Sequence, residues 1–178
     1  MNINFNQLIQ KILPSSFIFA LFLFLPKESL YNLLEKQLEK NSIIISNEKR
    51  DEKLFGLDIL NGDIYYENIN VANFKRISLE TFLIYSELKI DDVKLLKSLE
   101  SLAPSPIDEI VVKHSLLSFN KIDINAKGLF GELIGNIDIL KRVLTLELAA
   151  SSNMKNSYSN ILKNMKLNEG KYYYEYKF

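Results

Sequence analysis

A run of apolar residues close to the N-terminus constrains what this chain can fold into more than any other feature of its sequence. Residues 12–26 contain no ionisable side chain, and they are almost wholly aromatic and aliphatic from Phe17 to Leu25. Extended back to Leu8, the run would measure roughly 27 Å as an α-helix, close to the roughly 30 Å of a bilayer's hydrocarbon core. The sequence therefore predicts a transmembrane anchor within residues 1–26.

The free energy of membrane insertion favours this anchor. Its Leu, Ile and Phe side chains contribute roughly −0.3 to −0.6 kcal/mol each on an insertion scale, which outweighs Lys11, whose ammonium group can reach the headgroups. A cleaved secretory signal and a buried core helix are the alternatives, but residues 25–29 offer no small-x-small cleavage site. The predicted anchor residues are Leu8, Ile12, Phe17, Ile18, Phe19, Leu21, Phe22, Leu23, Phe24 and Leu25.

Composition limits the partners and the chemistry of the part that follows the anchor. That part is long enough for one domain, and we expect it outside the cytoplasm. The 22 Lys and Arg residues balance the 22 Asp and Glu residues, so the zero net charge gives no electrostatic case for nucleic acid as a partner. Cysteine is absent, which excludes disulfides, thiolate catalysis and thiolate metal sites.

The segment directly after the anchor has the pattern of an amphipathic helix. Over residues 27–40, charged side chains lie opposite a face that carries Leu30, Leu33, Leu34 and Leu38. This helix is expected to lie on the membrane surface or, alternatively, to pack as a short core helix under the following sheet.

From Asn41 onward the apolar period changes from 3.6 to 2, which is typical of strands. Strands are expected over residues 42–46, 54–60, 63–67, 68–71, 76–85 and 87–94, with a charged loop over 47–53. Asn61-Gly62 lies between two apolar alternating runs and predicts a type I′ hairpin turn. The leucine spacing over residues 95–102 predicts a short helix, and the prolines of residues 103–106 predict an internal boundary.

The second half of the chain repeats the strand pattern. Strands are expected over residues 107–112, 115–119, 121–127, 132–140, 142–148 and 171–178, with a helix over 152–165 that Ser151-Ser152 caps and a turn at 168–170. The predicted fold is a β-rich α+β fold, in which a transmembrane helix precedes a curved antiparallel sheet, either a half-barrel or an open sandwich, with two or three short helices. The predicted parts are residues 1–26 (cytoplasmic stub and anchor), 27–40 (helical linker) and 41–178 (β-domain).

Candidate reactive residues do not form a recognisable site. His114 has no second histidine or cysteine with which to share a metal, and the pattern of Gly128 and Gly131 lacks the third glycine of a phosphate loop. Asp91-Asp92 and Asp108-Glu109 are expected to be solvated turn acids, because neighbouring residues of a strand face opposite sides of the sheet. We therefore predict no catalytic, metal or cofactor-binding residue and no enzymatic activity.

The last strand carries the strongest candidates for binding a partner. Alternation places Tyr172, Tyr174, Tyr176 and Phe178 on one face. These aromatic side chains pack against the domain's own core, or they belong to an edge strand that adds to a neighbouring subunit.

Several short motifs resemble those of a known family. The anchor ends in Leu25-Pro26, Leu33-Leu34 follows, Leu54-Phe55-Gly56 precedes the strands, and residues 128–137 form a Gly-rich strand, GLFGELIGNI. This layout resembles type II secretion protein N and the related AsmA-like periplasmic proteins. The resemblance implies a bacterial inner-membrane anchor, a strongly curved periplasmic sheet without catalytic residues, and a role in a secretion apparatus or an elaborated flagellar motor.

These observations lead to two expected functions. The first is a structural subunit that is held by its single span in the inner-membrane bilayer and docks onto other periplasmic or inner-membrane subunits of a large complex. The alternative is a lipid-binding or lipid-transport module with an apolar groove in the curved sheet. An open apolar groove would favour the alternative, and a filled concave face would favour the first.

Overall fold

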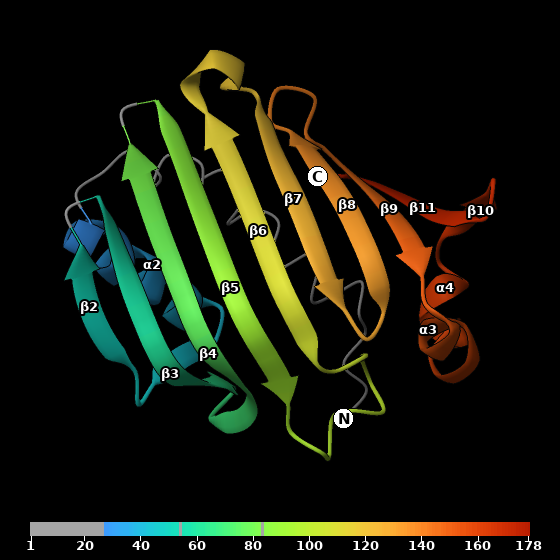
Figure 1. The fold of residues 1–178 in the computed structure, drawn as a ribbon, viewed down its shortest axis with the longest axis horizontal. Coiled ribbons are helices and arrows are strands. Elements are labelled where there is room, and N and C mark those ends of the chain that lie inside the picture. The colour runs from blue at the N-terminus through green and yellow to red at the C-terminus, as the bar shows by residue number, and fades with distance from the viewer. Residues whose placement is uncertain (1–26, 54, 83) are drawn as a thin grey trace.

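One open antiparallel sheet of eleven strands makes up most of the computed structural model, which describes residues 27–53, 55–82 and 84–178 (Figure 1). Its strand order is β1-β3-β4-β5-β6-β7-β8-β9-β11-β10, and β2 pairs with β3 beside β1. The predicted β-rich fold with an antiparallel sheet and a few short helices is confirmed. The predicted anchor lies outside the described residues. Within the described ranges, no helix has the length and apolar character needed to cross a bilayer.

The elements follow one another along the chain as a long meander. The helical elements are α2 (Lys27–Lys40), the 3-10 turn η1 (Leu116–Ser118), α3 (Ser152–Ser157) and α4 (Ser159–Leu162). The strands are β1 (Ile43–Ser46), β2 (Lys49–Lys53), β3 (Gly56–Tyr66), β4 (Ile69–Phe82), β5 (Tyr85–Leu95), β6 (Ile107–Ser115), β7 (Lys121–Gly128), β8 (Gly131–Asp138), β9 (Val143–Ala150), β10 (Lys166–Asn168) and β11 (Lys171–Lys177).

Alternating side chains give the sheet an apolar inner face and a polar outer face. The buried side chains of the inner face form three clusters, centred on Ile59, Ile122 and Leu148. Figure 1 shows α2 behind the first strands, over the Ile59 cluster, and α3 and α4 beside β9 at the other end of the sheet. The helices therefore cover the two ends of the apolar face.

Helix α2 spans the predicted range and packs against the sheet. Tyr31 is fully buried in the Ile59 cluster, and Leu34 and Leu38 are half-buried on the same side of the helix. Leu33 is exposed, so its predicted place on the packed face is wrong. The reason is that Tyr31, Leu34 and Leu38 already form the stripe three and four residues apart that faces the sheet, and Leu33 falls outside it.

The predicted hairpin at Asn61-Gly62 is wrong, because β3 runs straight through both residues. A type I′ turn needs positive φ at two successive residues, and here only Asn61 has one, at 54°. Gly62 instead lets the Phe74 ring pack closely, since a Cβ at this position would overlap that ring. The chain turns later, at Glu67-Asn68, where φ is 50° and 65°.

Three other local predictions are wrong for reasons of context. The predicted charged loop over residues 47–53 contains β2, because an edge strand can expose all its charges to solvent while its backbone pairs with β3. In place of the helix predicted over residues 95–102, Leu95 ends β5 and residues 97–102 form successive turns, since so short a segment before Pro104 nucleates poorly. The predicted strand over residues 115–119 is mostly η1, because the Ser115 hydroxyl accepts from the Leu117 amide and caps a turn.

The remaining second-half predictions agree more closely. Strands β7, β8, β9 and β11 occupy the expected segments, and Glu169-Gly170 makes the expected turn before β11. The predicted helix over residues 152–165 is broken into α3 and α4 at Tyr158, where φ is −126°. The residues predicted as an internal boundary, 103–106, connect β5 and β6, which are paired neighbours in the sheet.

Candidate functional site

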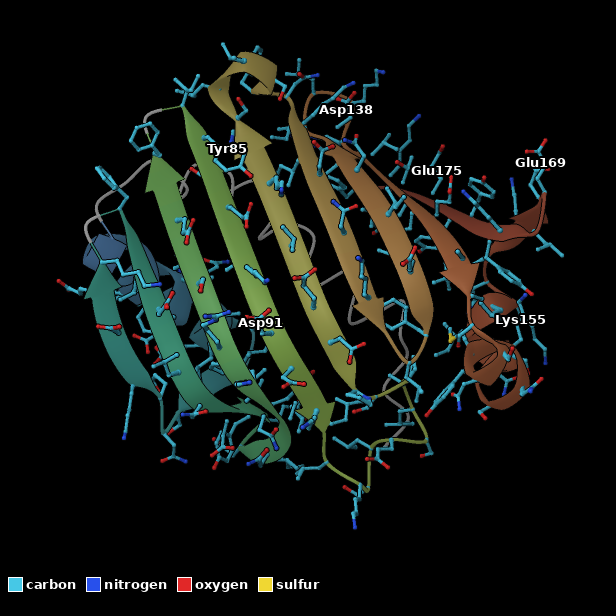
Figure 2. All side chains as sticks on the ribbon, in the orientation of Figure 1. Tyr85, Asp91, Asp138, Lys155, Glu169 and Glu175 are labelled. Carbon is cyan, nitrogen blue, oxygen red and sulfur yellow. The ribbon has the colours of Figure 1, made fainter. Side chains whose placement is uncertain are left out.

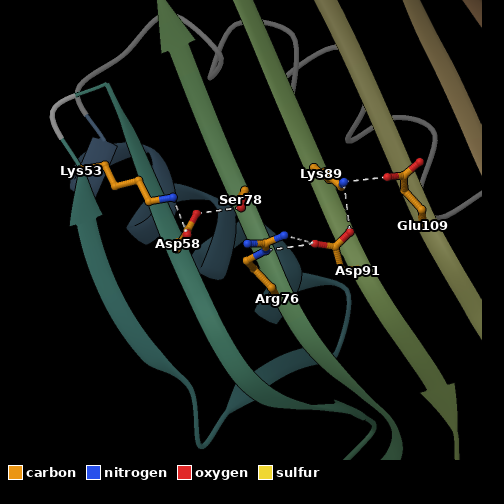
Figure 3. A network of polar contacts seen from close by, with 7 residues as sticks. All are labelled: Lys53, Asp58, Arg76, Ser78, Lys89, Asp91 and Glu109. Atoms are coloured by element: carbon orange, nitrogen blue, oxygen red, sulfur yellow. Dashed lines mark hydrogen bonds and ion pairs between the residues drawn. The ribbon is translucent and has the colours of Figure 1, made fainter.

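Charged side chains on the outer face pair across neighbouring strands (Figures 2 and 3). Arg76 on β4 donates from Nε and Nη2 to Asp91 on β5 at 2.9 and 2.7 Å. Lys89 lies 3.4 Å from the same carboxylate and 2.6 Å from Glu109 on β6. Exposed pairs of this kind contribute little free energy each, so they favour the correct strand register more than they add stability.

Asp58 is the buried carboxylate of this network. Its oxygens accept from the Lys53 ammonium at 2.6 Å and from the Ser78 hydroxyl at 2.7 Å. Burial by itself would raise the pKa of Asp58, but the hydrogen bonds from Lys53 and Ser78 lower this pKa below its usual range. The folded state therefore prefers the charged form of Asp58.

This preference predicts a pH dependence of stability. Because the pKa of Asp58 is lower in the folded state, its stabilisation is complete above the unfolded value of about 3.9 and is lost as the pH falls through the lower folded value. We expect Asp58→Asn to cost about 1 kcal/mol at neutral pH and to flatten the loss of stability below about pH 4. Urea unfolding of the full chain at several pH values measures both effects. Asp51→Asn, at the exposed edge opposite Asp58, is the matched control, and an equal effect there would contradict the prediction.

A line of inserted residues crosses four neighbouring strands of the sheet. Residues that share a face of a strand normally lie an even number apart. Phe74 and Ile77 nevertheless belong to one core cluster, and so do Ile90 and Val93. Each of these strands therefore contains one extra residue between its core positions.

The inserted residues lie side by side. The register places Asn61 opposite Lys75, Lys75 opposite Asp92, and Asp92 opposite Asp108. Asn61 and Asp92 have positive φ values of 54° and 57°, and the register of β6 shifts at Asp108. We call these four residues the crease. The register is the same on both sides of the crease between β3 and β6, and at the crease it shifts only between β6 and β7. The crease therefore changes which residues face the core without breaking the pairing of these strands.

The prediction that Asp91-Asp92 and Asp108-Glu109 lie in turns is wrong. They lie inside β5 and β6 and not in turns, and Asp91, Asp92 and Asp108 line one outer depression together with Lys75 and Arg76. Neighbouring residues share a face here because the extra residue of each strand interrupts the alternation of its side chains. Among the described residues, no group of three His, Cys, Asp or Glu side chains is placed to hold a metal ion.

The other predicted polar residues have local structural contacts. His114 is buried at the end of β6, and its Nε2 lies 3.0 Å from the carbonyl oxygen of Phe119. Ser151 caps α3, as predicted, by accepting from the Met154 amide at 3.0 Å, and its hydroxyl donates to the Leu129 carbonyl at 2.6 Å. Both residues hold turns in place.

Strand β11 combines a paired edge with an open one. It pairs with β9 from Tyr172 to Lys177, but on its other side β10 reaches only Lys171 to Tyr173. The Phe178 amide donates to the Arg142 carbonyl on the β9 side at 3.0 Å. Since backbone groups alternate in direction, Glu175 and Lys177 direct theirs to the open edge, where no described strand pairs with them.

The four aromatic candidates of this strand lie on the inner face. Tyr172 packs against the Leu148 cluster, and Tyr176 and Phe178 pack against the Ile122 cluster. Tyr174 lies between them and lines a cavity. The side chains thus contact the chain's own core, and a role for them in binding a partner stays a prediction.

The cavity that Tyr174 lines has a volume of about 230 Å³ and an apolar lining. The sheet forms its floor, and α3, α4 and the connection between β5 and β6 form its walls. The Tyr158 hydroxyl donates to the Glu100 carbonyl at 2.7 Å and so ties the helices to that connection. The lining residues are Ala103, Pro104, Ile107, Phe130, Leu133, Leu146, Leu148, Met154, Ile161, Asn164, Met165 and Tyr174.

Comparison with protein-family models, with curated proteins and with solved structures finds no match to this chain. The resemblance to type II secretion protein N and the AsmA-like proteins therefore stays a prediction.

Proposed function

We propose that this chain is a non-enzymatic structural subunit of a trans-envelope assembly, anchored in the bacterial inner membrane with its sheet in the periplasm. A secretion apparatus or an accessory structure of the flagellar motor is the kind of assembly that the resemblance implies. The observation that carries the proposal is the open edge of β11 at Glu175 and Lys177. Open strand edges bind extended segments of other chains through backbone hydrogen bonds.

The two edges of the sheet differ in a way that supports binding at β11. At the first edge, β2 exposes five successive side chains of which every one is charged, a pattern that discourages pairing with another chain. At the other edge, Tyr174 and Tyr176 alternate with Glu175 and Lys177. This alternation of aromatic and charged residues suits a strand in a continuous sheet.

The charges of the open edge also define the partner strand that fits. Glu175 and Lys177 are exposed and form no ion pair with another described residue. An antiparallel partner should place a cation opposite Glu175 and a carboxylate opposite Lys177. A second copy of β11 centred on Tyr176 meets this condition, since each Glu175 then faces the Lys177 of the other copy.

A photo-crosslinking residue in place of Glu175 tests the proposal in cells. We expect a covalent product with a neighbouring subunit or a second copy, and no such product from Asp51 on the charged edge. Lys177→Pro should abolish the product, because it removes an edge donor but no hydrogen bond to β9. Recovery of Glu175-labelled protein only at its monomer mass would contradict the proposal.

The apolar cavity favours a second candidate function, the binding of a lipid acyl chain. Its volume of about 230 Å³ exceeds the roughly 150 Å³ of an engineered apolar cavity that takes up benzene, and Asn164 and the Tyr174 hydroxyl bring the only polar side-chain groups to its lining. This function needs no other subunit, whereas the first needs no lipid.

Native mass spectrometry of the purified full chain tests the second candidate. We expect co-purified lipid that Leu146→Trp displaces by filling the cavity. Ile134→Trp is the matched control, because Ile134 is exposed on β8 and does not line the cavity. If the two variants retain equal amounts of lipid, the cavity is not the binding site.

A further inference from the structure

Exposed apolar side chains gather at one end of the sheet. In an antiparallel meander every second turn lies at the same end, and here the β2–β3, β4–β5, β6–β7 and β8–β9 turns form the upper end in Figure 1. The Phe55 and Phe82 rings join the first two turns edge to face, with centroids 5.3 Å apart. We call the exposed side chains of these turns the apolar rim: Phe55, Phe82, Ile84, Leu116, Leu117, Phe119 and Leu140.

Side-chain hydrogen bonds fix the turn that carries the most exposed residue of the rim. Leu117 is 84% exposed, at the centre of η1. The Ser115 hydroxyl accepts from the Leu117 amide at 3.2 Å, and His114 bonds to the Phe119 carbonyl at the other end of the turn. A soluble domain rarely keeps several large apolar side chains together in water, so the rim marks a contact surface.

Within the turns of the rim, basic residues outnumber acidic ones. The four turns, residues 53–55, 82–85, 116–121 and 139–142, contain no acidic residue but contain Lys53, Lys121, Lys141 and Arg142. Lys53 pairs with Asp58 at 2.6 Å and Lys141 pairs with Asp138 at 3.4 Å. Lys121 and Arg142 are exposed and form no ion pair with another described residue. At the opposite end, exposed Ile69 and Leu102 are accompanied by Glu67 and Glu100. Apolar side chains with exposed, unpaired cations beside them match the boundary between the acyl chains and anionic headgroups of a bilayer.

Helix α2 begins at the same end of the sheet as the rim. Glu35 lies 3.1 Å from Arg50 on β2, in the half of the sheet that leads to Phe55. After the helix ends, the Ser42 carbonyl accepts from the Glu67 amide at the opposite end of the sheet. The helix therefore begins at the rim end, and Lys27 directly follows residues 1–26, for which the sequence predicts the anchor.

We propose that the apolar rim inserts into the surface of the membrane that holds the predicted anchor, so that this end of the sheet contacts the bilayer. The occupant of this surface is the headgroup region of a membrane with anionic lipids. The inference rests on the proposed membrane location but not on the proposed partner at β11. It leaves the β11 edge open to other subunits.

Site-specific fluorescence on the full chain tests the rim. The chain has no cysteine, so Leu117→Cys can be labelled alone with an environment-sensitive dye and reconstituted into vesicles of phosphatidylcholine and phosphatidylglycerol. We expect blue-shifted emission and quenching by lipids with brominated acyl chains, severalfold stronger than for the same dye at Leu167→Cys or Ile134→Cys. These two controls are also exposed apolar residues, but they lie on β10 and β8, away from the rim.

Two further measurements separate the possible outcomes. A dye at Phe22→Cys reports on the anchor. If this dye is quenched while the Leu117 dye behaves like the controls, the proposed insertion of the rim is wrong and the proposed membrane location is supported. If neither dye is quenched, the proposed membrane location is wrong, and the rim with it. Lys121→Gln combined with Lys141→Gln should reduce quenching at Leu117 in the anionic vesicles and not in pure phosphatidylcholine. An equal effect in both would contradict the proposed role of anionic headgroups.

Discussion

Gly131→Ala is expected to destabilise the folded sheet by about 3–5 kcal/mol, a loss that lowers the urea midpoint of the full chain sharply. Gly131 has a φ of +111°, a conformation that side chains with a Cβ rarely adopt. An added Cβ would also overlap the Ala149 carbonyl oxygen on β9 and lie 2.8 Å from the Ser151 nitrogen. Neither obstacle is the end of a flexible side chain, so the backbone of both strands would have to shift.

Gly170→Ala is the matched control for this prediction. Gly170 also has a positive φ, at +81°, but no atom lies within 4 Å of the position that its Cβ would take. Only the conformational cost remains, which is about 1–2 kcal/mol. Equal losses for the two variants would mean that the close approach of β8 and β9 is not what requires glycine at residue 131.

Tyr31→Ala is expected to cost about 3–5 kcal/mol, because it removes a fully buried side chain through which α2 enters the Ile59 cluster. The ring also lies 4.3 Å from the Arg50 guanidinium, which covers it from the β2 side. Burial raises the pKa of Tyr31 well above its usual range, so its hydroxyl stays protonated and donates to Glu48 at 3.3 Å.

Tyr31→Phe separates the contribution of the ring from that of the hydroxyl. It keeps the packed ring and the contact with Arg50 and loses one hydrogen bond, so we expect a loss of only about 0.5–1.5 kcal/mol. Hydrogen exchange should show α2 losing protection in Tyr31→Ala while β9 and β11 keep theirs. A similar loss for both variants would place the stabilising contribution in the hydroxyl and contradict the packing argument.

Sequence periodicity predicted the central architecture because each strand has its own signal. The alternation over Lys121–Gly128 and Lys171–Lys177 requires only that one face of a strand be apolar and the other polar. The Glu169-Gly170 turn was equally local, since Gly170 readily takes its positive φ. These features depend on neighbours within a few residues, so the sequence specifies them directly.

Features that depend on pairing between strands were not predictable in the same way. Asn61 takes the positive φ that its residue type favours, yet β3 pairs with β4 on both sides of Asn61, so this residue interrupts the alternation of one strand and does not form a hairpin. Asp92 and Asp108 join Asn61 in the crease only because the register aligns three neighbouring strand pairs. The sequence contains each residue of the crease, but only the pairing of the strands aligns these residues.

The candidate sites also combine features that local sequence predicts with features that only strand pairing sets. The aromatic face of β11 follows from alternation alone, whereas its open edge follows from the shortness of β10, which pairs with only three of its residues. Likewise, Phe82, Leu117 and Leu140 belong to separate turns, none of which carries a signal of its own. By itself the sequence determined where most of the strands lie and which of their faces are apolar, because those properties arise from local alternation. The tertiary structure alone decided which turns share an end of the sheet and which edge stays open, because both depend on the order and direction in which the strands pair.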